Sequence, residues 1–311
     1  MGISRDGNTE YESNEPTFEE KTARLEEEIK QQLQEDPSLL VLNGKYFSTD
    51  EATILANSSQ LQSVRLLNLR DNQIGAPALK VLFTAPNLEY LEELDLSINF
   101  ITQDGIQEIA ESPEVMMKNL KAISLEDNRL VDEAAVVFFN APYFSKLESL
   151  NLGWNEVGNQ IAKALGANPK MNSLRILNLE RNYINEEGVR DLCDGGALKN
   201  LVELNLSSNK LGDPGAIALA NAQALPALKT LWLTSNEIGD DGAQALGEAK
   251  SLVSLEKLYI GRNYFGESGG NALYNTKTLS QLKTLVLQEE VGNNPNYANY
   301  SRPELLRPGF N

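Results

Sequence analysis

The sequence predicts an α/β solenoid, a horseshoe of about ten stacked units with a parallel β-sheet on the inside and helices on the outside. The first observation is the pattern L-x-x-L-x-L-x-x-N-x-L, which residues 64–74 and 174–184 match at every fixed position. The second is the spacing of its asparagine, for which six of the seven intervals are 27 residues and one is 29. This asparagine is found at Asn72, Asn99, Asn128, Asn155, Asn182, Asn209, Asn236 and Asn263.

Each unit is predicted to contain a strand, a turn and a helix. After the asparagine a second apolar pattern follows at about one helical turn, for example Val157, Ile161, Ala162 and Leu165. Asp213-Pro214 fits a helix N-cap followed by proline in the first turn. One unit cannot bury its own apolar face, but stacked units share a continuous core.

The repeated asparagine lies where the strand turns away, so its amide can satisfy backbone groups of that turn and of the adjacent one. Extending the period outward adds two end units, which carry Lys45 and Glu290 in the asparagine position. This gives ten units, eight of them standard. The longer interval places two extra residues within 110–119, where we expect the curvature to be distorted locally.

Four segments are predicted along the chain: a disordered N-terminus (1–14), an N-terminal capping helix (15–38), the solenoid (39–291) and a C-terminal cap or tail (292–311). The capping helix is predicted from apolar residues at helical spacing among glutamates, namely Phe18, Leu25, Ile29 and Leu33. Three prolines in the tail predict an extended seal without regular structure, and they are Pro295, Pro303 and Pro308.

Over residues 39–291 the chain resembles the ribonuclease-inhibitor type of leucine-rich-repeat protein, whose units alternate a strand and a full helix. The resemblance implies a leucine-rich-repeat solenoid that binds another protein, the property shared by the enzyme inhibitors, GTPase-activating proteins and sensor domains of this family. Units of mostly 27 residues are shorter than the family's usual unit, and the single cysteine departs from the cysteine-rich namesake inhibitor. A ribonuclease target is therefore not implied. The chain also resembles repeat effectors that intracellular bacterial pathogens deliver into host cells.

Composition limits the classes of partner. Of the 311 residues, 41% are hydrophobic and 23% charged, as in a folded soluble protein. A net charge of −17 opposes binding to nucleic acid, and it either keeps the protein soluble or steers a basic partner. The sequence shows no signal peptide and no membrane span, and its lone Cys193 suits a reducing compartment, so we expect a cytoplasmic protein.

The sequence offers little for catalysis, and we expect no enzyme, no metal and no cofactor. It contains no histidine, which removes the usual general base. Cys193 follows helical core positions and is predicted to pack there. The carboxylates Asp95, Glu126 and Glu180 should lie near one another on the inner surface, where solvated charges are favoured over a hydrolase. A GTPase-activating protein using Arg181 or Arg262 remains the main alternative.

The binding surface follows from strand alternation, because the residues between the core leucines must face the concavity. The position between the last two leucines is mostly small and polar, then becomes aromatic at Trp232 and Tyr259. Exposed aromatic and arginine side chains are typical of interface hot spots. We therefore predict a monomer that binds a protein, and that inhibits it or acts as a scaffold. The alternative is that the aromatics cover neighbours on the sheet. The predicted contact residues are Phe100, Glu126, Trp154, Glu180, Arg181, Tyr183, Trp232, Tyr259, Arg262 and Tyr264.

Overall fold

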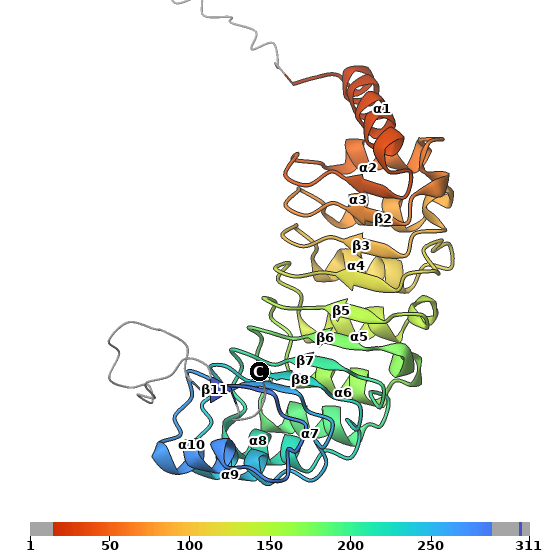
Figure 1. Ribbon diagram of the computed structural model, residues 1–311. Coiled ribbons are helices and arrows are strands. Elements are labelled where there is room, and N and C mark those ends of the chain that lie inside the picture. The colour runs from red at the N-terminus through yellow and green to blue at the C-terminus, as the bar shows by residue number, and fades with distance from the viewer. Residues whose placement is uncertain (1–14, 288–304, 307–311) are drawn as a thin grey trace, which may run out of the picture.

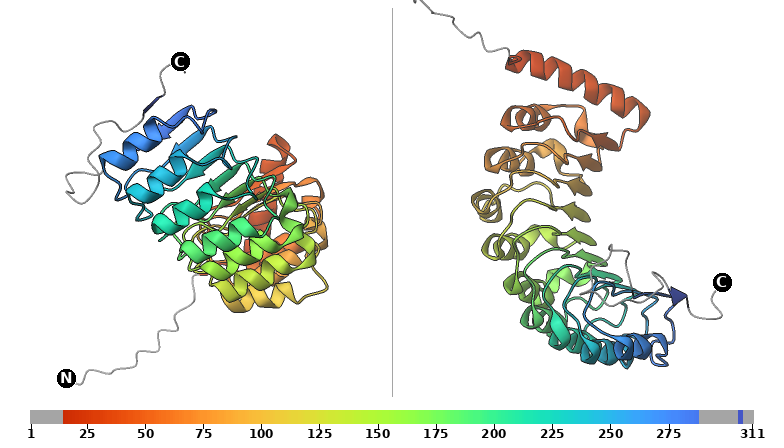
Figure 2. Two further views of the ribbon diagram at one scale, coloured as in Figure 1. Left: turned by 90° about the horizontal axis from the view of Figure 1, so that it is seen from below. Right: turned by 90° about the vertical axis from the view of Figure 1, so that its left-hand side faces the viewer.

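The computed structural model describes residues 15–287 and 305–306. The chain forms a curved solenoid with strands along its inner side and helices along its outer side (Figures 1 and 2). The predicted α/β solenoid is thus confirmed. Segment 1–14, most of the tail and Glu290 lie outside the described residues.

The sheet runs in sequence order from β1 to β11, and its first ten strands are parallel. Each of these strands has three residues, and the middle one is a buried core residue. Their bounds are β1 (Leu39–Val41), β2 (Leu66–Asn68), β3 (Glu93–Asp95), β4 (Ala122–Ser124), β5 (Ser149–Asn151), β6 (Ile176–Asn178), β7 (Glu203–Asn205), β8 (Thr230–Trp232), β9 (Lys257–Tyr259) and β10 (Thr284–Val286).

The helices stack on the outside, and consecutive ones pack against each other. Within the described residues, four short 3₁₀ turns also occur, at Leu61–Ser63, Pro86–Leu88, Pro142–Phe144 and Pro169–Ser173. The helices are α1 (Phe18–Glu35), α2 (Thr49–Asn57), α3 (Ala76–Phe83), α4 (Gln103–Ala110), α5 (Asp132–Asn140), α6 (Asn159–Ala167), α7 (Glu186–Asp194), α8 (Gly212–Ala220), α9 (Asp240–Gly247) and α10 (Glu267–Tyr274).

The repeated asparagines are buried and join each unit to the one before it. Asn155 shows the pattern: its Oδ1 accepts from the backbone N–H of Asn128 (3.1 Å) and Leu130 (2.9 Å). Its Nδ2 donates to the carbonyl oxygens of Leu125 (2.9 Å) and Leu152 (3.0 Å). One side chain therefore satisfies backbone groups of two neighbouring turns that would otherwise be buried without partners.

The N-terminal edge of the sheet is covered by α1. A capping box between Thr17 and Glu20 starts this helix, and its residues Leu25 and Ile29 are buried. Gln32 donates through Nε2 to the carbonyl of Val41 and accepts from its N–H at Oε1, both at 2.8 Å. The Gln32 amide thus replaces the neighbouring strand that β1 lacks.

Three details differ from the expectations. At the C-terminal edge, β11 (Leu305–Leu306) pairs antiparallel with β10, so the tail contains a strand where none was expected. Asp213 lies inside the first turn of α8, and its carboxylate accepts from Gly239 and Gly242 at the start of α9, so it caps the next unit's helix. Phe18, expected on the apolar face of the capping helix, is exposed.

The two extra residues of the third unit are accommodated between α4 and β4. The strands on either side keep the common register, with Leu94 opposite Ile123. The loop absorbs the insertion, and the hydrogen-bonded ladder of the sheet continues without a break.

Candidate partner-binding surface

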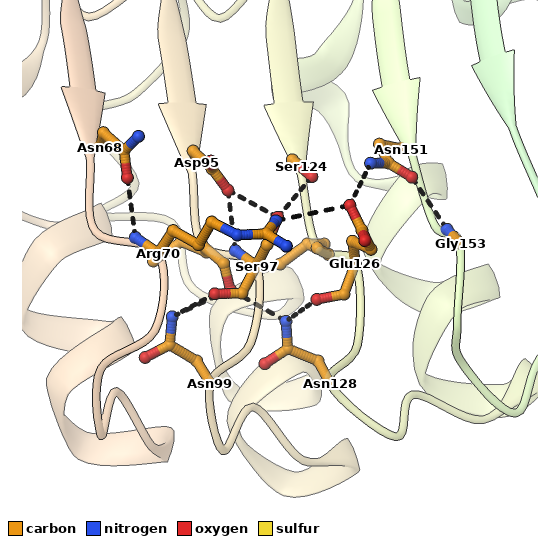
Figure 3. Close-up of polar contacts among 12 residues, drawn as sticks. Asn68, Arg70, Asp95, Ser97, Asn99, Ser124, Glu126, Asn128, Asn151 and Gly153 are labelled. Atoms are coloured by element: carbon orange, nitrogen blue, oxygen red, sulfur yellow. Dashed lines mark hydrogen bonds and ion pairs between the residues drawn. The ribbon is translucent and has the colours of Figure 1, made fainter. Parts of the chain in front are cut away.

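The last residue of half of the ten parallel strands uses its side chain to shape the turn that follows. In β2, β3, β5, β6 and β7 this residue is asparagine or aspartate, and its Oδ1 accepts from the backbone N–H two residues ahead at 2.9 Å. Such Asx turns replace a backbone turn bond. Asn68, Asp95 and Asn151, which Figure 3 draws at the ends of β2, β3 and β5, therefore serve the fold.

A polar network links the second to the fifth unit on this face (Figure 3). Glu126 accepts from Asn151 Nδ2 at 3.0 Å and lies 3.5 Å from the guanidinium of Arg70. Asp95 accepts from the hydroxyl of Ser97 at 2.6 Å, and that hydroxyl lies 2.7 Å from Ser124 Oγ. Asp95 and Glu126, two of the three acids expected to lie near one another, thus have separate partners.

Glu180 repeats this arrangement two units further on, where its Oε2 accepts from Asn205 Nδ2 at 3.1 Å. Each of the three predicted carboxylates accepts hydrogen bonds from a neighbouring side chain instead of sharing a site with another acid. This arrangement fits solvated charges on the inner face and gives no sign of a catalytic pair.

The character of the strand ends changes at β8 and β9. Trp232 and Tyr259 occupy the position held by asparagine in β5 to β7, and their rings stack at 5.4 Å between centroids and 10° between planes. Both side chains are half-buried. The rings therefore cover each other in part, as the alternative interpretation expected, and each keeps part of its surface open to solvent.

The residue before each repeated asparagine has a left-handed backbone in all eight standard units. The sequence did not indicate this conformation, because these positions contain no glycine and include Ile98 (φ 52°) and Trp154 (φ 56°). The positions follow the three-residue strands, so their side chains leave from the turn and not from the sheet.

The predicted surface consequently divides into two groups. We call Trp232 and Tyr259 the sheet pair. The remaining aromatic and arginine residues lie at the turn edge of the solenoid, beyond the strand ends: Phe100, Trp154, Arg181, Tyr183, Arg262 and Tyr264. The two tryptophans were expected on one surface, but one belongs to the sheet and the other to the turn edge.

Within the turn-edge group, Trp154 and Arg181 interact directly. The guanidinium carbon of Arg181 lies 3.8 Å from the centre of the Trp154 ring, a cation–π contact between neighbouring units. Phe100, Tyr183 and Tyr264 are exposed, and Arg262 is half-buried. Arg181 thus lies against an aromatic face of the neighbouring unit.

Two kinds of exposed residue were not singled out from the sequence. The first residue of each strand also faces inward, and it includes the exposed apolar Leu39 and Ile176. Strand alternation, applied to one more position, would have found them. The other is Tyr46 of the first unit, the exposed aromatic residue after Lys45, which aligns with Phe100, Tyr183 and Tyr264.

Catalytic and metal chemistry find no support in the described part of the chain. Cys193 is buried, and burial followed by the charge of Asp194 raises the pKa of its thiol to about 12. It is a packing residue, since a protonated buried thiol is a poor nucleophile. Across residues 15–287 and 305–306, no cluster of three or more cysteine, aspartate or glutamate side chains is arranged to hold a metal ion. Among these same residues no helix is both long and apolar enough to span a membrane.

Comparison with known proteins assigns the repeats. A family model described as Leucine Rich repeat matches residues 60–83, 145–166, 170–193, 197–220 and 225–247. The chain has the fold of a leucine-rich-repeat solenoid. No curated protein matches it in sequence. Among solved structures, an internalin (inlF) from Listeria monocytogenes is similar over 86% of this chain and 89% of its own, with 20% identity and a TM-score of 0.43. A likeness at that level carries no argument about function. Leucine-rich-repeat proteins are in general modules for protein interaction.

Proposed function

We propose that this leucine-rich-repeat solenoid binds a folded protein partner through the sheet pair, Trp232 and Tyr259, with Trp154 and Arg181 at the turn edge as further contacts. The observation that carries the proposal is the replacement of a turn-forming asparagine by two stacked aromatic rings in consecutive strands. The leucine core is complete beneath them, since Leu231 and Leu258 are fully buried. The rings are therefore not needed to fill the core, and partly exposed Trp and Tyr are typical of binding hot spots.

Binding itself is the proposed activity. The described residues hold a cap and a solenoid, and no group of cysteine, aspartate and glutamate side chains among them is arranged to hold a metal ion. A partner held on the inner face would have part of its surface covered, which supports inhibition or scaffolding. The half-buried state of the sheet pair favours a flat or convex protein surface over a small ligand enclosed in a pocket.

The test uses substitutions that the fold already accepts. Trp232→Asn and Tyr259→Asn install the residue that β5, β6 and β7 carry at this position, so the turn can form its Asx bond. A partner captured with the wild-type protein should bind the double variant at least about tenfold more weakly, because two hot-spot rings are lost. Lys163→Ala on the outer helix α6 is the control. Equal affinity of wild type and the double variant would refute the proposal.

A further inference from the structure

A groove runs along the turn edge of the first four units, in the half of the molecule that lacks the sheet pair. It encloses about 400 Å³ and is lined by turn residues of successive units, among them Tyr46, Asp71, Gln73, Ile98 and Phe100. Of these five residues, only Phe100 belongs to the predicted contact residues, and the groove therefore needs its own explanation.

Two aromatic rings form the walls of this groove. Tyr46 and Phe100 occupy the same position in the first and third units, with Gln73 in the second unit between them. The Tyr46 and Phe100 side chains are 77% and 62% exposed, so neither ring is used by the core. At a strand spacing of roughly 4.8 Å, two units separate them by about 10 Å. A group halfway between the rings would lie about 5 Å from each, which is within cation–π range.

The charge at the centre of the groove is negative. Asp71 lies in the same unit as Gln73, and no cation of the described residues comes within ion-pair distance of its carboxylate. Two basic residues of the same and the preceding unit are engaged elsewhere, because Lys45 pairs with Glu28 at 2.6 Å and Arg70 lies 3.5 Å from Glu126. The carboxylate of Asp71 is therefore left without a counter-charge.

The charged residues at the fourth-unit end of the groove do not make its charge positive. Asp127 and Arg129 also line it, but they belong to the fourth unit, beyond Phe100, and their charges are opposite. The space between Tyr46 and Phe100 is therefore dominated by one carboxylate and two aromatic faces. Carboxylate and aromatic faces together select a cation that carries an apolar stem.

We propose that this groove receives an arginine or lysine side chain from a protein partner, with its charged head beside Asp71 and its stem between Tyr46 and Phe100. The net charge of −17 favours the approach of a basic segment. The groove and the sheet pair share no residues, so this proposal holds or fails independently of the proposed function.

The experiment uses three short peptides with acetylated and amidated ends, Gly-Ser-Gly-X-Gly-Ser-Gly, in which X is arginine, lysine or uncharged norleucine. The protein carries ¹³C-labelled isoleucine methyl groups, and Ile98 lines the groove. We expect the arginine or the lysine peptide to shift the Ile98 signal saturably in the millimolar range, the scale of a single side-chain contact. The signal of Ile176, exposed on the sheet of the sixth unit, should stay in place.

Two variants and a matched control complete the test. Asp71→Asn keeps a residue that tolerates the left-handed backbone at this position (φ 56°), and Phe100→Ala removes an exposed ring without leaving a cavity. Each should weaken peptide binding at least about threefold, whereas Tyr264→Ala, an exposed aromatic at the same position of the ninth unit, should not. The proposal is overturned if neither charged peptide gives a saturable shift at Ile98, if norleucine binds as well, or if both groove variants bind like wild type.

Discussion

The strand ends of the middle units and those of β8 and β9 hold the same place in the sheet but do different work. In β5 to β7, asparagine accepts the N–H of the turn that follows, so its side chain belongs to the fold. In β8 and β9, Trp232 and Tyr259 stack on each other instead. The solenoid therefore forms without the asparagine at these two positions. A side chain released from a structural role is available for binding.

The largest effect on stability is expected in the leucine core, because the units with polar strand ends and those with aromatic strand ends share it. Leu179 is fully buried in the sixth unit, two units before the first aromatic strand end. Leu179→Asp places a carboxylate in that core and should cost at least about 3 kcal/mol of unfolding free energy. Because solenoid units are stabilised by their neighbours, urea denaturation should show several units lost together. A denaturation midpoint equal to that of wild type would contradict the strand register that buries Leu179.

The second effect concerns the repeated asparagine that every standard unit shares. Asn155→Ala removes the acceptor of two backbone N–H groups and the donor to the carbonyls of Leu125 and Leu152. Buried backbone groups left unpaired cost about 1–3 kcal/mol each, partly relieved by relaxation, so we expect a loss of about 2–4 kcal/mol. Chemical denaturation measures it, and a loss below about 1 kcal/mol would show that water replaces the side chain.

The sequence was sufficient to predict the repeat, the core and the asparagine positions, because each depends on residues at a fixed period. Leu150 and Leu152 are buried where strand alternation places them. It was not sufficient for contacts between units. Asp213 was assigned to its own helix, yet it caps α9, a contact 26 residues away that no local pattern encodes. The strand at Leu305–Leu306 likewise depends on the free edge of β10.

The candidate surface was predicted less completely, since alternation ends where the strands end. The left-handed backbone at Trp154 and Arg181 follows from the shape of the repeated turn, and residue type does not reveal it. The sequence therefore combined the turn edge and the sheet into one surface. Five expectations stay predictions: the ribonuclease-inhibitor subtype, the boundaries of cap and tail, the monomeric state, the cytoplasmic location and the contact residues themselves.

A third, smaller effect separates the two kinds of strand end. Asn151→Ala removes the acceptor of the Gly153 N–H and a donor to Glu126, both at a half-buried position. We expect a loss of about 1 kcal/mol, the usual net value of such a hydrogen bond. Thermal and urea unfolding of Asn151→Ala and of Asn155→Ala, measured side by side, gives the ratio of the two losses in unfolding free energy. If Asn151→Ala loses no stability, the polar strand ends do not serve the fold, and the contrast with the sheet pair is mistaken.

The smallest effect is expected at the turn edge, where Arg181 lies over Trp154. Arg181→Gln removes the cation from an exposed ring, so the stability loss should be about 0.5 kcal/mol. The contact has a second readout, because the chain contains two tryptophans and Trp232→Phe leaves Trp154 as the only one. In that background Arg181→Gln should change the fluorescence of Trp154, whereas Lys163→Ala on α6 should change neither fluorescence nor stability. A stability loss above about 2 kcal/mol would place Arg181 among the structural residues, and the turn edge would then resemble the polar strand ends more than the sheet pair.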